Sequence, residues 1–363
     1  MHPNQNKLLA LDHNDGCVLM LTVFSDSHRL HHGTELKDGV LKPSFEQPSR
    51  ADTVRDRVQH VGLGDIIVPR TFDRACYVNA HSERYVSFLE SAWSEWTATG
   101  REHDALPLVW PVRDLSNEQV PAFIDGKLGF FAMDAGSPIT ATTWDAVKTS
   151  ADIALTGLSL INEGHNSAFA LCRPPGHHAA REYMGGYCYL NNAAIAAQHA
   201  LTQGAKRVAV LDVDFHHGNG TQNIFYNRND VMFASLHGEP SVSYPYYSGF
   251  SSECGTGAGE GYNLNYPLPK NTTWQSYQNA LMHACKKLRN FSPELLVISL
   301  GVDTFKDDPI SHFLLESDDF FGMGEIIATV GAPTLFVMEG GYMVDEIGIN
   351  AVNVLHGYES KQS

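Results

Sequence analysis

The sequence predicts a single α/β domain built on an open, mostly parallel β-sheet that is flanked by helices. From about residue 167 onward, short β-branched and apolar runs alternate with helical patterns, as is typical of parallel sheets. Polar clusters follow directly after several of these runs. The chain has 363 residues, of which 43% are hydrophobic, and this is enough for one domain with a deep core. We expect the domain to span residues 20–358 and assign no role to the extension 1–19.

Five apolar runs are the expected strands of the sheet. They are Ser167–Cys172, Arg207–Phe215, Val231–Leu236, Leu295–Leu300 and Thr334–Met338. Between them, apolar residues at helical spacing predict a helix packed on the sheet, at Tyr277, Ala280, Leu281, Ala284 and Leu288. A second helix is expected up to Ala200, with Asn191 or Asn192 as its N-cap.

A less regular stretch, about residues 85–135, is expected to be an insertion of helices and loops. It contains Trp93, Trp96 and Trp110, three of the five tryptophans of the chain. Such aromatic residues indicate either an exposed interface or a satellite core beneath a long excursion, and both interpretations remain open at this point.

Charge and cysteine content exclude several classes of function. The formal net charge of -16 disfavours nucleic acid as a partner and suits a cationic ligand without selecting one. The six cysteines form no CxxC pair, so neither a disulfide framework nor a thiolate zinc cluster is expected. The apolar run Cys17–Phe24 is too short to span a membrane, and we expect a cytoplasmic protein without membrane contact.

A metal site is predicted after two of the expected strands. Asp212, Asp214 and His216 alternate along an extended segment, so their side chains point to one face. A carboxylate and an imidazole two residues apart can reach one metal ion, and Asp303 at the end of another strand supplies a third ligand. Two carboxylates and one histidine leave positions open for water and a substrate carbonyl, as in catalytic sites. Zinc is the first choice, with iron or cobalt as alternatives.

Two adjacent histidines, His177 and His178, follow the first expected strand after a Pro-Pro-Gly turn. Neighbouring imidazoles suit general acid–base catalysis, and each needs a partner that orients its second ring nitrogen. Asp212 and Asn219 are available for this purpose. A carboxylate partner favours the charged imidazolium and an amide leaves the ring neutral more easily, so we expect the two histidines to differ in function.

The last expected strand is followed by Glu339-Gly340-Gly341-Tyr342. The two glycines let the backbone bend, and the hydroxyl of Tyr342 can then turn inward. A phenol in that position can donate a hydrogen bond to a developing oxyanion.

Taken together, these motifs resemble those of the histone deacetylase superfamily, which has the arginase/deacetylase fold. The motifs are Arg-Pro-Pro-Gly-His-His, Asp-Val-Asp-Phe-His-His-Gly-Asn-Gly-Thr-Gln, Gly-Val-Asp-Thr and Glu-Gly-Gly-Tyr, and they occur in the family's order. The resemblance covers roughly Phe24 to His356, and within the superfamily the sequence is most similar to the acetylpolyamine amidohydrolases.

The resemblance implies a role for each residue of the predicted site. Asp214, His216 and Asp303 would bind zinc, and Tyr342 would stabilise the oxyanion. His178 would act first as general base and then as general acid. His177 with Asp212 would form a charged electrostatic pair. Asn219 stands where some members of the superfamily carry aspartate, so the partner of His178 would be an amide here and not a second carboxylate.

Further residues are implied by the same resemblance. Tyr187 and Tyr244 would form aromatic walls of a substrate channel, and Glu35 and Asp125 would receive the distal ammonium group near the channel mouth. Two structural potassium sites are implied, one through Asp212, Asp214, His216, Ser235 and Leu236, and another through Phe225, Arg228, Val231 and Tyr262. The insertion would form a homodimer and narrow the entrance.

The expected function is therefore the zinc-dependent hydrolysis of small N-acetylated polyamines to acetate and free amine. A deacetylase of acetyl-lysine proteins or peptides is the nearest alternative, because it would differ only in access to the channel. An arginase-type ureohydrolase is less favoured, since its two-metal site needs more bridging carboxylates than stand beside His216. A non-catalytic acyl-amine binding protein is disfavoured because no ligand and no catalytic residue is missing.

Overall fold

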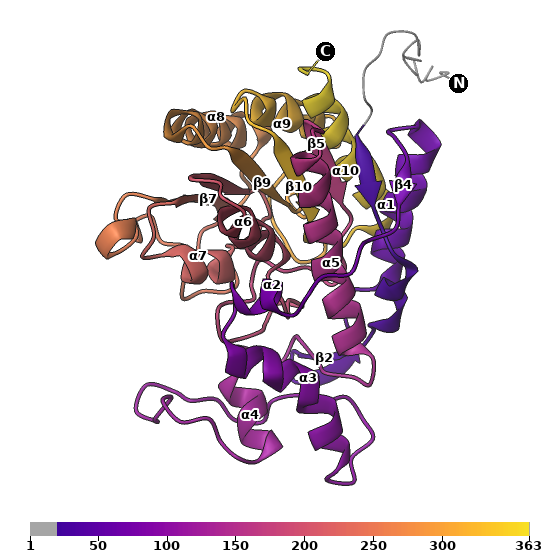
Figure 1. Cartoon of the computed structure of the whole chain (residues 1–363), viewed down its shortest axis with the longest axis vertical. Coiled ribbons are helices and arrows are strands. Elements are labelled where there is room, and N and C mark those ends of the chain that lie inside the picture. Colours follow the sequence, from indigo (N-terminus) through magenta and orange to yellow (C-terminus); the bar gives the residue numbers. More distant parts are fainter. Residues whose placement is uncertain (1–19, 363) are drawn as a thin grey trace.

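The computed structural model describes residues 20–362, and its centre is an eight-stranded sheet in the order β4-β1-β5-β10-β9-β6-β7-β8 (Figure 1). Every pair of neighbouring strands in it is parallel. The predicted fold class, an open parallel sheet flanked by helices, is thereby confirmed. The strands are β1 (Leu21–Val23), β4 (Ile66–Ile67), β5 (Ser167–Ala170), β6 (Val208–Asp212), β7 (Val231–Gly238), β8 (Asn263–Leu268), β9 (Leu295–Leu300) and β10 (Thr334–Met338).

All five predicted strands are present, whereas β1, β4 and β8 were not predicted. Strand β1 has three residues and β4 has two. Neither is long enough to show the alternation of apolar and polar residues that identifies a strand in a sequence. Strand β8 contains Pro267 as well as Asn263 and Asn265. It lies at the edge of the sheet, where proline and polar side chains are tolerated because one side of the strand needs no ladder partner.

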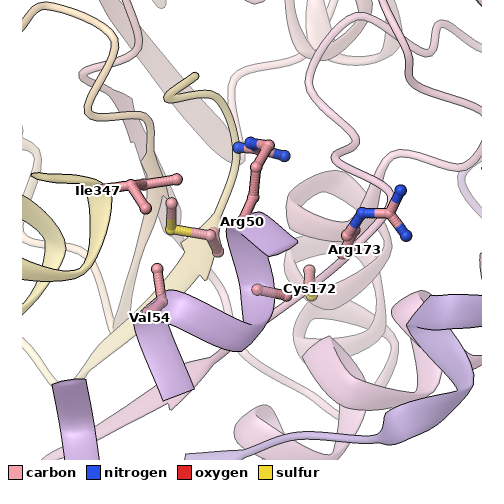
Figure 2. Close-up of a pocket in the computed structure, with 7 residues that line it drawn as sticks. Arg50, Val54, Cys172, Arg173 and Ile347 are labelled. Atoms are coloured by element: carbon pink, nitrogen blue, oxygen red, sulfur yellow. The ribbon is translucent and has the colours of Figure 1, made fainter. Parts of the chain in front are cut away.

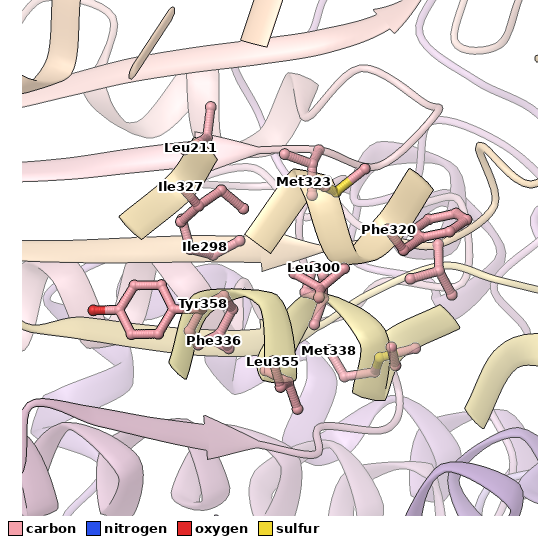
Figure 3. Close-up of a cluster of buried hydrophobic side chains, with 14 of the residues drawn as sticks. Leu211, Ile298, Leu300, Phe320, Met323, Ile327, Phe336, Met338, Leu355 and Tyr358 are labelled. Atoms are coloured by element: carbon pink, nitrogen blue, oxygen red, sulfur yellow. The ribbon is translucent and has the colours of Figure 1, made fainter. Parts of the chain in front are cut away.

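Helices cover both faces of the sheet. One face packs against α1 (Pro48–Val61), α8 (Trp274–Phe291), α9 (Asp319–Ala328) and α10 (Val344–Glu359). Figure 3 shows part of this core, where Ile298 and Leu300 of β9 and Phe336 of β10 lie in one cluster with Ile327 of α9 and Leu355 of α10. The other face packs against α5 (Thr143–Asn162), α6 (Asn192–Thr202) and α7 (Asn219–Phe225). The two layers of helices hold the strand ends, and the loops after them, in fixed positions.

The predicted helices are confirmed in α8 and α6. Asn191 is the N-cap of α6, and its side-chain oxygen accepts a hydrogen bond of 2.9 Å from the Ala194 amide. No helix in the part of the chain that the structure describes is long and apolar enough to cross a membrane.

The stretch predicted as an insertion contains α3 (Glu83–Thr97) and α4 (Ile124–Phe130), which lie below the sheet layers in Figure 1. Phe88, Trp96 and Phe131 are buried in a separate hydrophobic cluster, as a satellite core requires. The loop between the two helices nevertheless exposes apolar side chains, namely Leu108, Val109, Val112, Leu115 and Phe123. Core and exposed apolar surface are therefore both present in this stretch.

The remaining elements are short. They are the β2 (Thr34–Lys37) and β3 (Val40–Pro43) hairpin, α2 (Ala75–Val78), and the 3-10 turns Asp26–Leu30 and Gly257–Gly259. The predicted N-terminal extension, 1–19, lies outside the described residues.

Candidate active site

The three predicted metal ligands meet at the carboxyl ends of β6 and β9. Asp214 and His216 follow β6, Asp303 follows β9, and one ligand atom from each lies within 4.8 Å of the others. The His216 Nδ1 atom is 2.9 Å from Asp303 Oδ2 and 3.3 Å from Asp214 Oδ1. Two carboxylates and an imidazole in this arrangement fit a single zinc ion and leave room for further ligands. Burial and the negative charge of Asp214 raise the pKa of Asp303 to about 8, so the cluster favours a cation.

Backbone groups from two strand ends hold the carboxylates in place. The Gly340 amide donates to Asp214 Oδ2 at 2.8 Å, and the Phe215 amide donates to Asp303 Oδ1 at 2.7 Å. A Cβ atom on Gly301 would lie 2.1 Å from Asp214 Oδ2, and one on Gly340 would lie 2.5 Å from it. Both positions therefore require glycine, because any side chain would displace the carboxylate.

The two histidines have the partners that the sequence predicts. His177 Nδ1 lies 2.9 Å from Asp212 Oδ2, and His178 Nδ1 lies 2.6 Å from the side-chain oxygen of Asn219. Burial acts to lower the pKa of His177, but the charges of Asp212 and Asp214 outweigh it and hold that pKa well above its usual value. Burial lowers the pKa of His178 well below its usual value, and the neighbouring His177 adds to this effect. The pair thus consists of a charged and a neutral imidazole, as a division between electrostatic partner and general base requires.

Tyr342 lies in a turn held by charged residues far away in sequence. Its amide donates to Asp308 Oδ2 at 2.7 Å, and the Arg50 guanidinium stacks over its ring at 4.7 Å from the centroid. Arg50 also donates to the carbonyl oxygens of Gly341 and Glu339, at 2.5 and 2.6 Å. Burial raises the pKa of Tyr342 well above its usual value, so the hydroxyl keeps its proton and can donate it.

The two predicted channel tyrosines pack against different residues of the site. The Tyr244 ring meets His178 edge-on at a centroid distance of 5.1 Å and lies 6.0 Å from the ring of His216. The Tyr187 ring packs against Tyr342 at 5.7 Å. Tyr187 is buried and Tyr244 is half-buried, and both rings pack against predicted catalytic residues, as the walls of a channel would.

The two acidic residues proposed for the channel mouth are placed very differently. Glu35 is buried, and its Oε2 atom accepts a hydrogen bond of 2.9 Å from the Tyr187 hydroxyl. Its Oε1 atom is buried without a hydrogen-bond partner in the described structure. Asp125 lies in the insertion, where Arg101 binds both of its carboxylate oxygens. Its charge is therefore compensated within the chain, and a role for Asp125 in binding substrate stays a prediction.

The predicted potassium ligands fall into two places. Asp212 and Ser235 are register partners on β6 and β7, and the first set gathers around these strand ends. In the second set the Phe225 carbonyl accepts from the Arg228 amide at 3.0 Å, and the Tyr262 carbonyl accepts from the Phe233 amide at 2.9 Å. Potassium binding at both places stays a prediction.

Several residues that shape the site were not predicted as site residues. Arg50, Glu46 and Arg173 form a buried charged network, with Glu46 Oε1 at 2.8 Å from Arg50 and 2.7 Å from Arg173. Figure 2 shows the two arginines beside Cys172 in a small pocket that α1 and α10 also line. Asp134, also not predicted, accepts from the Tyr244 hydroxyl at 2.6 Å. Arg50, Glu46 and Asp134 lie in no motif, so no local pattern in the sequence could have identified them.

Comparison with known proteins agrees with this geometry. The family model of the histone deacetylase domain matches residues 44–358. Acetylpolyamine amidohydrolase 2 of Pseudomonas aeruginosa is 57% identical, covering 94% of this chain and 99% of its own, and the acetylpolyamine amidohydrolase of Mycoplana ramosa is 47% identical, covering 93% and 99%. The crystal structure of acetylpolyamine aminohydrolase from Burkholderia pseudomallei superposes with a TM-score of 0.88 at 38% identity, covering 93% of this chain and 98% of that one. The chain therefore belongs to the histone deacetylase superfamily and, within it, to the acetylpolyamine amidohydrolases.

Proposed function

We propose that the chain is a zinc-dependent deacetylase that hydrolyses the acetamide bond of small N-acetylated polyamines and diamines, releasing acetate and the free amine. The observation that carries this proposal is the buried Asp214, His216 and Asp303 cluster, with a neutral histidine and a protonated tyrosine near it. The names of the relatives supply the substrate class. The net charge of -16 is compatible with a cationic amine.

The side chains of the site divide the work of amide hydrolysis. When bound at the cluster, zinc would polarise the acetamide carbonyl and make water more acidic. His178, neutral and held by Asn219, accepts a proton from the attacking water and later delivers it to the departing nitrogen. His177, charged beside Asp212, and the Tyr342 hydroxyl stabilise the negative charge that develops on the former carbonyl oxygen.

Recognition of the distal ammonium group is assigned to Glu35. Its Oε1 atom is buried and has no hydrogen-bond partner among residues 20–362, and its other oxygen accepts from Tyr187, whose ring packs against Tyr342. A buried carboxylate oxygen without a donor favours a ligand that brings a positive charge and hydrogen-bond donors. An ammonium group on a short aliphatic chain meets both requirements.

The choice of substrate is tested by initial rates with zinc-loaded protein on acetylputrescine, acetylcadaverine, a long acetylated spermine and an acetyl-lysine peptide. Rapid turnover of the small diamines with a poor rate on the peptide is expected. The reverse preference would make the chain a peptide or protein deacetylase. Inactivity on all four compounds would reopen the interpretation as a binding protein.

Replacing Glu35 by glutamine is expected to raise KM for acetylputrescine by about tenfold while kcat changes little. The reason is that a charge-assisted hydrogen bond to the ammonium group is weakened, at a cost of about 1.5 kcal/mol or more. Glutamine can still accept from the Tyr187 hydroxyl, so the channel wall stays in place. Steady-state kinetics on acetylputrescine and on uncharged N-butylacetamide measure the effect.

The uncharged amide serves as the control for this variant, because its KM should not respond to Glu35→Gln. Asp125→Asn gives a matched test of the second acidic residue, whose charge Arg101 already compensates. Equal KM values for acetylputrescine in the parent and in Glu35→Gln would remove Glu35 from substrate recognition.

The exposed apolar side chains of the insertion loop, Leu108, Val109, Val112, Leu115 and Phe123, support a homodimer formed through the insertion. Sedimentation equilibrium is expected to give the mass of two chains, and a monomer at micromolar concentration would contradict it.

We also propose structural potassium at the two predicted places. In that case thermal stability should be higher in potassium than in tetramethylammonium salts, and identical stability would argue against it.

A cytoplasmic location without nucleic-acid or membrane partners accords with the acidic charge, and fractionation of cells tests it.

A further inference from the structure

Glu339 joins the last strand to the turn that carries the two histidines. It follows β10 directly, and its side chain is completely buried. The Oε2 atom accepts hydrogen bonds from the amides of Gly176 at 2.6 Å and His177 at 3.1 Å. The Oε1 atom accepts from the Ser299 hydroxyl of β9 at 3.1 Å. One carboxylate thus connects three segments that are far apart in the sequence.

In the described structure the group of opposite charge that acts on this carboxylate is His177, which attracts it electrostatically. No arginine or lysine side chain forms an ion pair with it among residues 20–362. A buried carboxylate without a paired cation is costly to maintain, and burial raises its pKa to about 7. The three hydrogen bonds of Glu339, together with the energetic cost of burying its carboxylate, indicate that this residue does more than fill space in the core.

The turn that Glu339 binds is also enclosed on its other side. A Cβ atom on Gly176 would lie 2.5 Å from the Asn192 amide nitrogen, so the backbone of the turn packs directly against the start of α6. Glu339 closes the opposite side with two of its hydrogen bonds. The backbone carbonyl of Glu339 is in turn bound by Arg50, which stacks on Tyr342. Glu339 is therefore hydrogen-bonded directly to the histidine turn and linked to the Tyr342 ring through Arg50.

We propose that Glu339 is a positioning residue for the deacetylation reaction. It fixes the backbone of the His177–His178 turn relative to β9 and β10, and so keeps the general base at a constant separation from the tyrosine that binds the oxyanion. The inference rests on the proposed deacetylase function. It assigns to Glu339 a geometric task, in which its oxygens matter as hydrogen-bond acceptors and it makes no contact with substrate.

The test compares Glu339→Ala with Glu339→Gln in zinc-loaded protein, using steady-state kinetics on acetylputrescine. Alanine is expected to lower kcat by about tenfold to a hundredfold with KM within about threefold of the parent, because small misplacements of reacting groups are costly. Glutamine keeps an acceptor oxygen toward the two amides and can meet the Ser299 hydroxyl with its amide group. It is expected to restore kcat to within about threefold of the parent.

Ser299→Ala provides a milder perturbation that still bears on the proposal if Glu339→Ala does not fold. This variant removes only the hydrogen bond from the Ser299 hydroxyl to the Glu339 carboxylate. We expect kcat to fall by a few fold and KM to stay unchanged. Asp152→Asn is the matched control, since Asp152 is also a buried carboxylate but binds the Tyr77 hydroxyl. Zinc content and melting temperature are measured for every variant.

The proposal is overturned if folded, zinc-loaded Glu339→Ala has a kcat within twofold of the parent. It is also overturned if Glu339→Gln loses as much kcat as Glu339→Ala, because charge and not geometry would then be responsible. Where alanine does not fold, an unchanged kcat in Ser299→Ala overturns it. Failure of the proposed function is distinguishable, since the parent protein itself would then be inactive on acetylputrescine.

Discussion

Replacing Tyr342 by phenylalanine is expected to lower kcat for acetylputrescine by about a hundredfold or more, which is the usual cost of removing one oxyanion donor. The ring should keep its position, because the Asp308 carboxylate holds the Tyr342 amide and Arg50 stacks over the ring. The change therefore removes a hydroxyl whose pKa burial raises far above neutrality, so that in the parent it is always protonated and able to donate. Pre-steady-state or steady-state rates with zinc-loaded enzyme measure the loss.

A matched control for this variant is Tyr358→Phe. Tyr358 of α10 is also a buried tyrosine, and its hydroxyl lies 3.5 Å from the Ala332 carbonyl. This contact lies away from the predicted catalytic residues. It should change melting temperature slightly and leave kcat unchanged. Unchanged turnover in Tyr342→Phe would remove this hydroxyl from the mechanism and leave the stabilisation of the oxyanion to other groups.

Much of the fold could be predicted because the strands of a parallel sheet are buried on both faces. Strands such as Leu295–Leu300 are therefore continuous apolar runs, which the sequence displays directly. The edge strand β8 is the opposite case. Its Asn263 and Asn265 side chains both donate to the Gln222 side-chain oxygen, so its polar residues are explained by a contact with α7 that no local pattern reveals.

In the site, likewise, residues that belong to local motifs could be predicted, whereas residues that reach it from distant segments could not. The predicted metal ligands follow the ends of β6 and β9, and parallel strands bring those ends together, so motif spacing was enough to predict that Asp214, His216 and Asp303 meet. Arg50 reaches Tyr342 from α1, across 291 positions to the Gly341 carbonyl. Such contacts depend on how helices pack on the sheet. These contacts can be identified only once the fold is known.

Acidic residues show where composition is least informative. Glu35 and Asp125 are both carboxylates in segments without a clear pattern. In the part of the chain that the structure describes, Glu35 has a buried oxygen without a hydrogen-bond partner, whereas Asp125 is neutralised by Arg101. The difference lies in the partner that the fold provides. A carboxylate is available to a cationic substrate only if no arginine or lysine of the chain has already bound it.

The largest loss is expected for Asp303→Asn, which should lower kcat/KM by about a thousandfold or more because the Lewis acid and its activated water are lost with the metal. Asparagine is nearly isosteric, and its oxygen can still accept from the Phe215 amide that holds the residue in the parent. The fold should therefore persist. The cluster, however, would lose one of its two anionic ligands and with it most of its affinity for a divalent cation.

Zinc content by atomic absorption and the initial rate on acetylputrescine are measured on the same sample of Asp303→Asn. We expect less than one zinc per chain after dialysis, whereas Asp152→Asn, with a buried carboxylate bound to Tyr77, should retain the metal. Adding excess zinc should restore only part of the activity, because the neutral amide is a weaker ligand than a carboxylate. A variant that keeps both its zinc and its turnover would show that Asp303 does not bind the catalytic metal, and the assignment of this cluster would then be wrong.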